Sequence, residues 1–403
     1  MAAAPPAASA PAAIPATGQA AAGLESFDEM MVQFLRRFSA PGAALAVGRA
    51  GQVVYSRGFG YADAEKQQPV QPESLFRIAS ISKPITSVAV LHLVDRGKLK
   101  LSDRVADVLK LPLDGQADPR WRDITVLDLL HHAGGFDSSK SGDPMFLSVR
   151  IARQFGVDPP AGPAEIIRYM IRQPLDFDPA ARYAYSNFGY CLLGRVIEKI
   201  SAQPYETYVR REILQPCGAA GMRLGRSLLE DRLPGEVRYY DSKGHKGKCV
   251  FAGKLDQIVP APYGTFDAEA MDSHGGWAAS AADLVRFGMA FDRTGPQALL
   301  SPQSIQTTFA PPVFRASASG PASAPARKSG FYYGCGWNVR PAGSGTFNAW
   351  HLGGLPGTST ILVRRHDGLV WAVLFNGDHA ADGQWLAAHV DGLVHEAADK
   401  ARW

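Results

Sequence analysis

Strand-like segments occur near both ends of this chain, with helical patterns between them, and this order restricts how the chain can fold. Runs at 43–48 and 53–59 flank Arg49-Ala50-Gly51 and predict a hairpin. Further strand-like runs occur at 334–340, 360–364 and 370–375. The simplest packing brings the strands from both ends into one antiparallel sheet.

Helical spacing of apolar residues predicts helices over 24–38 and 384–400, beside the two groups of strands. A buried helix is predicted over 81–96, where Gly97 closes it. Further helices are predicted over 126–132, 164–172, 188–200, 204–214 and 280–291. We therefore predict an α+β fold, in which an antiparallel β-sheet is flanked by N- and C-terminal helices and joined to an all-helical lobe.

The predicted organisation is one domain over 23–403 that follows a linker over 1–22. The α/β part covers 23–100 and 270–403, and the helical lobe covers 101–269, with a site expected between the two. The linker is almost entirely Ala, Pro, Ser and Thr, a composition that favours disorder. It lacks the cationic start and apolar run of a signal peptide. We favour a periplasmic or secreted protein, with a cytoplasmic one as the alternative.

Composition excludes several classes of function. Net charge is +4 and the basic residues are scattered, so no nucleic-acid partner is expected. No apolar stretch reaches the roughly 18 residues that span a bilayer, so no transmembrane segment is expected. A Pro/Ala/Ser-rich stretch at 311–330 predicts a mobile surface loop of unknown role. The oligomeric state is left open.

The cysteines show no Cys-x-x-Cys pair, so no metal site is expected. They are Cys191, Cys217, Cys249 and Cys335. Four cysteines allow three disulfide pairings in an oxidising compartment, and the sequence does not choose among them. Isolated buried thiols are the favoured interpretation, because free cysteines are commonly buried.

Candidate catalytic residues begin with Ser80-Ile81-Ser82-Lys83, where a helix starts. Residues three apart share a helix face, so the hydroxyl of Ser80 and the amine of Lys83 can meet. The free N–H groups of the helix start can hold an oxyanion, and its positive end favours a neutral lysine. The alternative is a helix-capping serine beside a surface lysine.

Two further motifs add to this one. Tyr185-Ser186-Asn187 supplies a hydroxyl that can shuttle a proton and an amide that can donate and accept. Its alternative is a half-buried tyrosine beside an asparagine cap. His351-Leu352-Gly353-Gly354 supplies a glycine pair at a sheet edge, where a substrate can lie against backbone and one N–H can complete an oxyanion hole. Its alternative is a glycine-rich turn.

These three motifs in this order resemble the serine β-lactamase and penicillin-binding protein superfamily, in its class C-like branch. The resemblance runs from about residue 34 to 396 and includes 74–79, 124–132 and 275–277. It implies that Ser80 is acylated, that Lys83 and Tyr185 move protons, and that no cofactor is needed. It also implies that Asn187 contacts the acyl side chain or orients Lys83. The oxyanion-hole N–H groups would come from Ser80 and Gly354.

The third motif departs from the family pattern. At the third motif, the pattern of class C β-lactamases looks like Lys-Thr-Gly, whereas this chain has His351, Leu352 and Gly353. A neutral histidine offers no fixed charge to a β-lactam carboxylate, a loss of about 1.5 to 3 kcal/mol. His-x-Gly resembles some DD-peptidases and D-aminopeptidases, so the site is not disabled by the change.

We therefore expect a serine hydrolase that cleaves small-molecule esters or small amides, as carboxylesterases of this superfamily do. The alternatives are a D-aminopeptidase, DD-peptidase or amide-oligomer hydrolase, a weak β-lactamase, or a catalytically silent binding homologue. The histidines His132, His274 and His379 are interpreted as structural, because a lysine–tyrosine system needs no histidine base.

Overall fold

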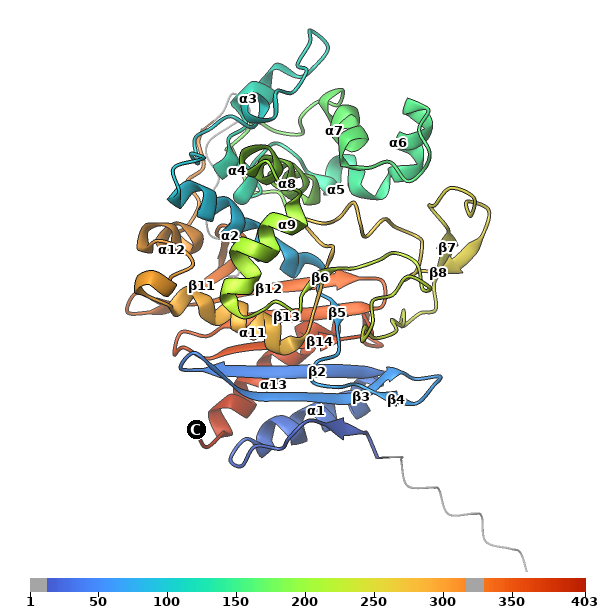
Figure 1. Cartoon of the computed structure of the whole chain (residues 1–403), viewed down its shortest axis with the longest axis vertical. Coiled ribbons are helices and arrows are strands. Elements are labelled where there is room, and N and C mark those ends of the chain that lie inside the picture. Colours follow the sequence, from blue (N-terminus) through green and yellow to red (C-terminus); the bar gives the residue numbers. More distant parts are fainter. Residues whose placement is uncertain (1–12, 317–329) are drawn as a thin grey trace, which may run out of the picture.

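The computed structural model describes residues 13–316 and 330–403. Its main sheet is antiparallel and joins both ends of the chain, as predicted (Figure 1). The strand order is β1-β3-β2-β14-β13-β12-β11-β10, with β4 paired to β3. The strands are β1 (Ala16–Thr17), β2 (Gly42–Arg49), β3 (Gln52–Asp63), β4 (Gln68–Pro69), β10 (Tyr332–Tyr333), β11 (Asn338–Gly343), β12 (Thr346–Leu355), β13 (Thr358–Arg364) and β14 (Val370–Phe375).

Helices cover both faces of this sheet (Figure 1). The terminal helices α1 (Glu25–Phe38) and α13 (Leu386–Lys400) pack against each other and against one face. Helix α11 (Ala281–Met289) packs on β2 and β14 from the other face. Alternate residues of β2 enter different cores: Leu45 lies in the core beneath α1 and α13, whereas Ala44 and Ala46 lie in the core beneath α11. Burial on both faces explains why β2 and β14 read as continuous apolar runs.

Helical segments form the other part of the molecule, around α2 (Ser82–Asp95) and α8 (Asn187–Ser201), which contact each other. The remaining helices are α3 (Val105–Leu109), α4 (Val126–Leu130), α5 (Ser138–Ser141), α6 (Ser148–Phe155), α7 (Pro163–Ile171), α9 (Tyr205–Val209), α10 (Gln215–Cys217) and α12 (Pro302–Phe309). Short helical turns are η1 (Ala79–Ile81), η2 (Pro119–Asp123), η3 (Pro144–Phe146), the π-turn η4 (Arg210–Leu214), η5 (Ala290–Asp292) and η6 (Gly295–Gln297).

Two small sheets complete the fold. Strand β9 (Trp277–Ala279) pairs with β5 (Phe76–Arg77) and β6 (Arg223–Leu224), and β7 (Lys246–Lys248) pairs with β8 (Ile258–Pro260). Because β5 leads directly into η1, its pairing with β9 fixes the backbone just before Ser80. The expected α+β class is therefore confirmed, with the serine at the junction of sheet and helices.

Part of the predicted linker is ordered. Residues Ala16 and Thr17 pair with Phe59 and Gly58 of β3, and the hydroxyl of Thr17 donates to Val70 O. The prediction of disorder over 1–22 is therefore wrong for this stretch, because strand pairing satisfies its backbone groups. Residues 1–12 lie outside the described residues. So do residues 317–329 of the predicted 311–330 loop.

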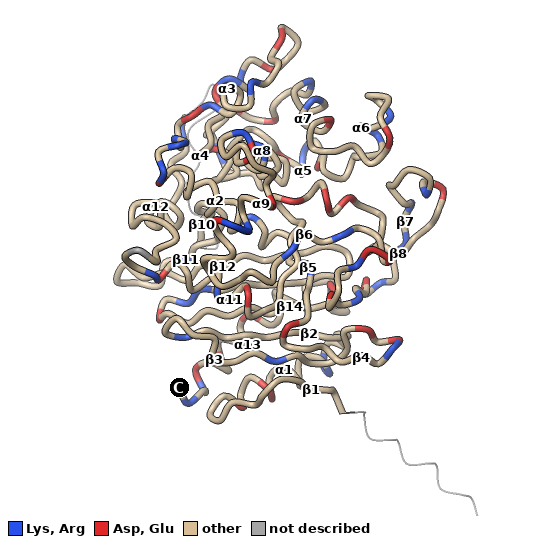
Figure 2. The backbone as a smooth tube through the Cα atoms, viewed as in Figure 1, with Lys and Arg blue, Asp and Glu red and all other residues tan. Residues whose placement is uncertain are grey.

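The distribution of charged residues and the state of the cysteines agree with the predictions from the sequence. Figure 2 shows acidic and basic residues interspersed over the described chain, without a stripe of one sign. The four cysteines are free and buried, as the favoured interpretation predicted. Among the helices that the structure describes, none is long and apolar enough to cross a membrane.

Candidate active site

Ser80 lies in η1, the tight turn that runs directly into α2. The residue before it, Ala79, has φ of +47°, a left-handed conformation that is costly for a side chain larger than glycine. Burial among Phe266, Met271 and Leu355 holds Ala79 in place. Ser80 itself is only half-buried, and α2 has no side-chain cap. The capping interpretation of Ser80 is therefore not supported, and its hydroxyl remains accessible.

Lys83 is fully buried one turn further along and points back at Ser80. Its Nζ lies 3.1 Å from Ser80 Oγ, 2.7 Å from Asn187 Oδ1 and 2.8 Å from the carbonyl oxygen of His274. Burial lowers the pKa of Lys83 well below its usual value. A neutral amine has two N–H groups and one lone pair. Because Asn187 Oδ1 and the His274 carbonyl can only accept, they take both N–H groups and leave the lone pair for the Ser80 hydroxyl.

Tyr185 also lies beside Lys83, with its ring centroid 4.7 Å from Lys83 Nζ. Burial raises the pKa of Tyr185, while a hydrogen bond with Ser80 lowers it, and the first effect dominates. Tyr185 is therefore a neutral phenol at pH 7. The ring of His132 packs against the Tyr185 ring, with the two centroids 4.3 Å apart. His132 Nδ1 accepts from the backbone N–H of Ser186. His132 thus supports the Tyr-Ser-Asn segment structurally.

Asn187 is the first residue of α8, and both ends of its amide are bonded within the protein. Its Oδ1 accepts from Lys83, and its Nδ2 donates to Asp143 Oδ2 at 2.6 Å. Of the two roles that the family resemblance implied, this geometry favours orienting Lys83.

The third motif lies in β12, a strand that the sequence did not predict. The His351 ring is buried, with Nδ1 donating to Leu352 O at 2.7 Å and Nε2 accepting from the Tyr333 hydroxyl at 3.0 Å. Burial lowers the pKa of His351 to about 3. His351 was predicted as a substrate-binding residue, and in the structure both of its ring nitrogens are bonded inside the protein.

Gly353 allows β12 to approach the backbone just before η1 closely. A Cβ at Gly353 would collide with the carbonyl oxygen of Ile78 and the hydroxyl of Thr360. Among the described residues, β11 pairs with β12 only as far as Trp350, which leaves the edge of β12 beyond it open. Leu355 and Thr358 close the two-residue turn between β12 and β13 as a hydrogen-bonded pair, so the next pair, Gly354 and Ser359, is not hydrogen-bonded. The N–H of Gly354 therefore points away from β13, toward that open edge. This arrangement suits an oxyanion-hole donor.

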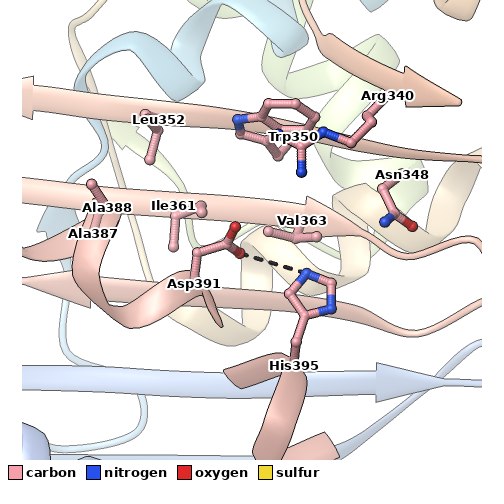
Figure 3. Close-up of a pocket in the computed structure, with 10 residues that line it drawn as sticks. All are labelled: Arg340, Asn348, Trp350, Leu352, Ile361, Val363, Ala387, Ala388, Asp391 and His395. Carbon is pink, nitrogen blue, oxygen red and sulfur yellow. Dashed lines mark ion pairs between the residues drawn. The ribbon is translucent and has the colours of Figure 1, made fainter. Parts of the chain in front are cut away.

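The opposite face of β12 borders a separate cavity of about 210 Å³. Figure 3 shows Leu352 and Trp350 on this face, with Asp391 and His395 of α13 across from them. Leu352 therefore faces α13 rather than following His351 and Gly353 toward η1.

Sequence reasoning missed several residues of the site. Asp143 belongs to a segment that the sequence could not place, and no local pattern connects it with Asn187, 44 positions away. The Tyr333 hydroxyl and the His274 carbonyl were missed for the same reason: both reach the site only through tertiary packing.

Comparisons with known proteins show the family to which this chain belongs. The family model described as Beta-lactamase matches residues 27–393. A putative fimbrial assembly protein, FimD of Dichelobacter nodosus, is 32% identical over 236 residues, which cover 58% of this chain and 53% of that protein. Esterase EstB of Burkholderia gladioli is 33% identical over 198 residues, 47% of this chain and 49% of EstB. The chain thus spans about half the length of these relatives.

Solved structures share the fold. D-amino acid amidase from Ochrobactrum anthropi superposes with a TM-score of 0.68 at 21% identity, over 94% of this chain and 98% of that one. An octameric penicillin-binding protein homologue from Pyrococcus abyssi gives a TM-score of 0.65 at 24% identity, over 94% of this chain and 78% of that one.

The fold is the one that penicillin-binding proteins and related hydrolases share. Within that group of proteins, the chain belongs to the beta-lactamase family.

Proposed function

We propose that this protein hydrolyses small esters through an acyl-enzyme formed on Ser80. The observation that carries the proposal is the environment of Lys83. Two carbonyl-type oxygens accept from its N–H groups, and its lone pair faces Ser80 Oγ at 3.1 Å. A buried amine held in this way accepts a proton at neutral pH.

In acylation, Lys83 takes the hydroxyl proton of Ser80 while Oγ bonds to the ester carbonyl carbon. The carbonyl oxygen becomes an oxyanion, which the backbone N–H groups of Ser80 and Gly354 stabilise. When the intermediate collapses, the bond to the alkoxy group breaks. Tyr185 gives its proton to the departing oxygen and regains one from Lys83, so that the alcohol leaves and the acyl group stays on Oγ.

Deacylation repeats these steps with water. A water proton passes to Lys83, either directly or relayed by the Tyr185 hydroxyl, while the water oxygen bonds to the acyl carbon. Ser80 Oγ then leaves and recovers a proton from Lys83. The carboxylic acid product departs and the starting protonation state returns.

Ester substrates are favoured over β-lactams because of the third motif. His351 is neutral and turned toward Tyr333, so it offers no positive charge to a β-lactam carboxylate. Similarity to the esterase EstB supports the same choice. Cleavage of D-amino acid amides is the second candidate, and the similarity of fold to D-amino acid amidase supports it.

The test compares kcat/KM for a short-chain p-nitrophenyl ester, a D-aminoacyl amide and a chromogenic cephalosporin. We expect the ester to be preferred over the cephalosporin by a hundredfold or more, about 2.7 kcal/mol of transition-state free energy. Equal or faster cephalosporin hydrolysis would contradict the argument from His351. Faster cleavage of the amide would move the proposal to the amidase alternative.

A further inference from the structure

The segment between α4 and α6 passes beside the site and brings one carboxylate to it. Ser138 Oγ donates to the Tyr185 carbonyl at 3.4 Å. Further along, half-buried Asp143 caps η3, its Oδ1 accepting from Met145 N at 3.0 Å. Its other oxygen accepts from Asn187 Nδ2 at 2.6 Å. Both carboxylate oxygens of Asp143 are thus bonded within the protein.

The bond to Asp143 decides which way round the Asn187 amide lies. A carboxylate can only accept, so it selects the NH₂ end of the amide and turns Oδ1 toward Lys83. In the reversed orientation, the Asn187 NH₂ group would face the Lys83 amine and carboxylate oxygen would face amide oxygen. Asp143 therefore keeps in place one of the two acceptors that direct the lone pair of Lys83.

Asp143 also brings charge. The other titratable groups facing Lys83 are Tyr185 and Tyr190, with ring centroids at 4.7 and 5.9 Å, and the histidines His274 and His351. Burial raises the pKa of both tyrosines and lowers the pKa of both histidines, so all four are neutral at pH 7. Among the described residues around Lys83, the carboxylate of Asp143 is the charge that opposes burial and raises the pKa of the amine.

We propose that Asp143 is a positioning residue of this site: it locks the Asn187 amide against Lys83, and its charge sets the pH range in which Lys83 acts as a base. This inference rests on the proposed function. A base whose pKa falls far below the working pH accepts protons poorly. A nearby carboxylate keeps the amine basic without occupying the substrate side of the site.

The experiment follows the pH dependence of Ser80 modification by a fluorophosphonate, which needs Lys83 but no particular ester, together with kcat/KM for a p-nitrophenyl ester. Asp143→Asn removes the charge and leaves an oxygen that can still accept from Asn187. In this variant, we expect the acid limb of the pH–rate profile, where the rate rises as Lys83 loses its proton, to move to lower pH by about one unit. Asp143→Ala should show the same shift and a further 10- to 100-fold loss in kcat, because Asn187 is released. Asp143→Glu, which keeps the charge, should retain the wild-type limb.

Asp137→Asn is the matched control, since Asp137 caps the neighbouring α5 through Ser139 and binds Arg182 instead of Asn187. Its acid limb should not move. An unmoved limb in both Asp143→Asn and Asp143→Ala, or an equal shift in the control, overturns the inference while leaving the proposed function intact. A wild-type protein that the probe does not modify at any pH overturns both.

Discussion

Burial sets the charge of the side chains around Ser80. Burial lowers the pKa of Lys83 well below 10.5 and raises the pKa of Tyr185, so it favours the neutral form of each side chain. In the resting site, neither side chain then leaves an unpaired ion in the interior. The same desolvation that would destabilise a charged lysine favours the neutral amine that the proposed mechanism requires of Lys83.

The first prediction concerns Lys83. Lys83→Ala should lower kcat/KM for a p-nitrophenyl ester by about 10²- to 10⁴-fold, the range typical of a general base. In the wild type, kcat/KM should rise with pH through the pKa of Lys83 and reach its plateau well below pH 10.5, because only the neutral amine is active. Lys254, which binds Glu230 at the surface, supplies the control: Lys254→Ala should change neither quantity. A fall of less than tenfold in Lys83→Ala would contradict the assigned role.

The second prediction concerns the Tyr185 hydroxyl. Tyr185→Phe keeps the ring that packs on Lys83 and His132 but removes the proton relay, so kcat should fall by about 10²- to 10⁴-fold. Steady-state kinetics on the ester measure this. Tyr183→Phe, a change in a ring that also packs on His132, should stay within a few-fold of wild type. Equal losses in the two variants would indicate a general packing effect.

Residues of the site were predictable where chemistry follows local spacing. Ser80 and Lys83 meet because residues three apart share a helix face, and α8 begins at Asn187, one residue before the predicted helix over 188–200. Asp143 and Tyr333 were not predictable, because their contacts join segments far apart in the sequence. The inward orientation of the His351 ring depends on its hydrogen bond with Tyr333, so it could not be predicted from the sequence either.

At the scale of elements, strand β12 holds the third motif against the turn that carries Ser80. Strands such as β14 were predicted residue for residue, because burial on both faces produces an unbroken apolar run. Strand β12 was missed because Gly353-Gly354 resembles a turn, and its polar and apolar residues do not alternate regularly. The need for glycine comes from the close approach of η1, which only the tertiary structure reveals.

The third prediction follows from this approach. Gly353→Ala places a methyl group against the Ile78 carbonyl and Thr360, so β12 must move away from η1. Thermal or denaturant unfolding should show a loss of about 1 to 3 kcal/mol, and ester hydrolysis should fall as the oxyanion site opens. In the control Gly392→Ala, a Cβ in α13 meets nothing within 4 Å, so stability should hold or rise. A Gly353→Ala variant with unchanged stability and activity would contradict the packing argument.

At the scale of the whole molecule, buried histidines make stability depend on pH. Burial lowers the pKa of His92 and His131 to about 4 and that of His351 to about 3, from 6.5. The unfolded chain therefore binds more protons than the folded one below pH 6.5, and the free energy of unfolding must fall as the solution is acidified.

The fourth prediction is the size of this effect. Between pH 6 and 4, each of these histidines should cost up to about 1.4 kcal/mol of stability per pH unit. Urea unfolding at several pH values measures the slope, and His92→Asn should make it shallower than in wild type. A free energy of unfolding that stays constant from pH 7 to 4 would contradict the burial of these rings.

The central claim is that Ser80 carries the acyl group, and mass spectrometry of the intact protein and of its proteolytic peptides tests it most directly. The protein is mixed with p-nitrophenyl butyrate and quenched in acid within the first turnovers. We predict one added butyryl group on the peptide that contains Ser80. Slower deacylation should make this acylated fraction larger in Tyr185→Phe. Ser80→Ala should carry no butyryl group and should not hydrolyse the ester. A butyryl group on another residue, or a Ser80→Ala variant with full esterase activity, would contradict the account.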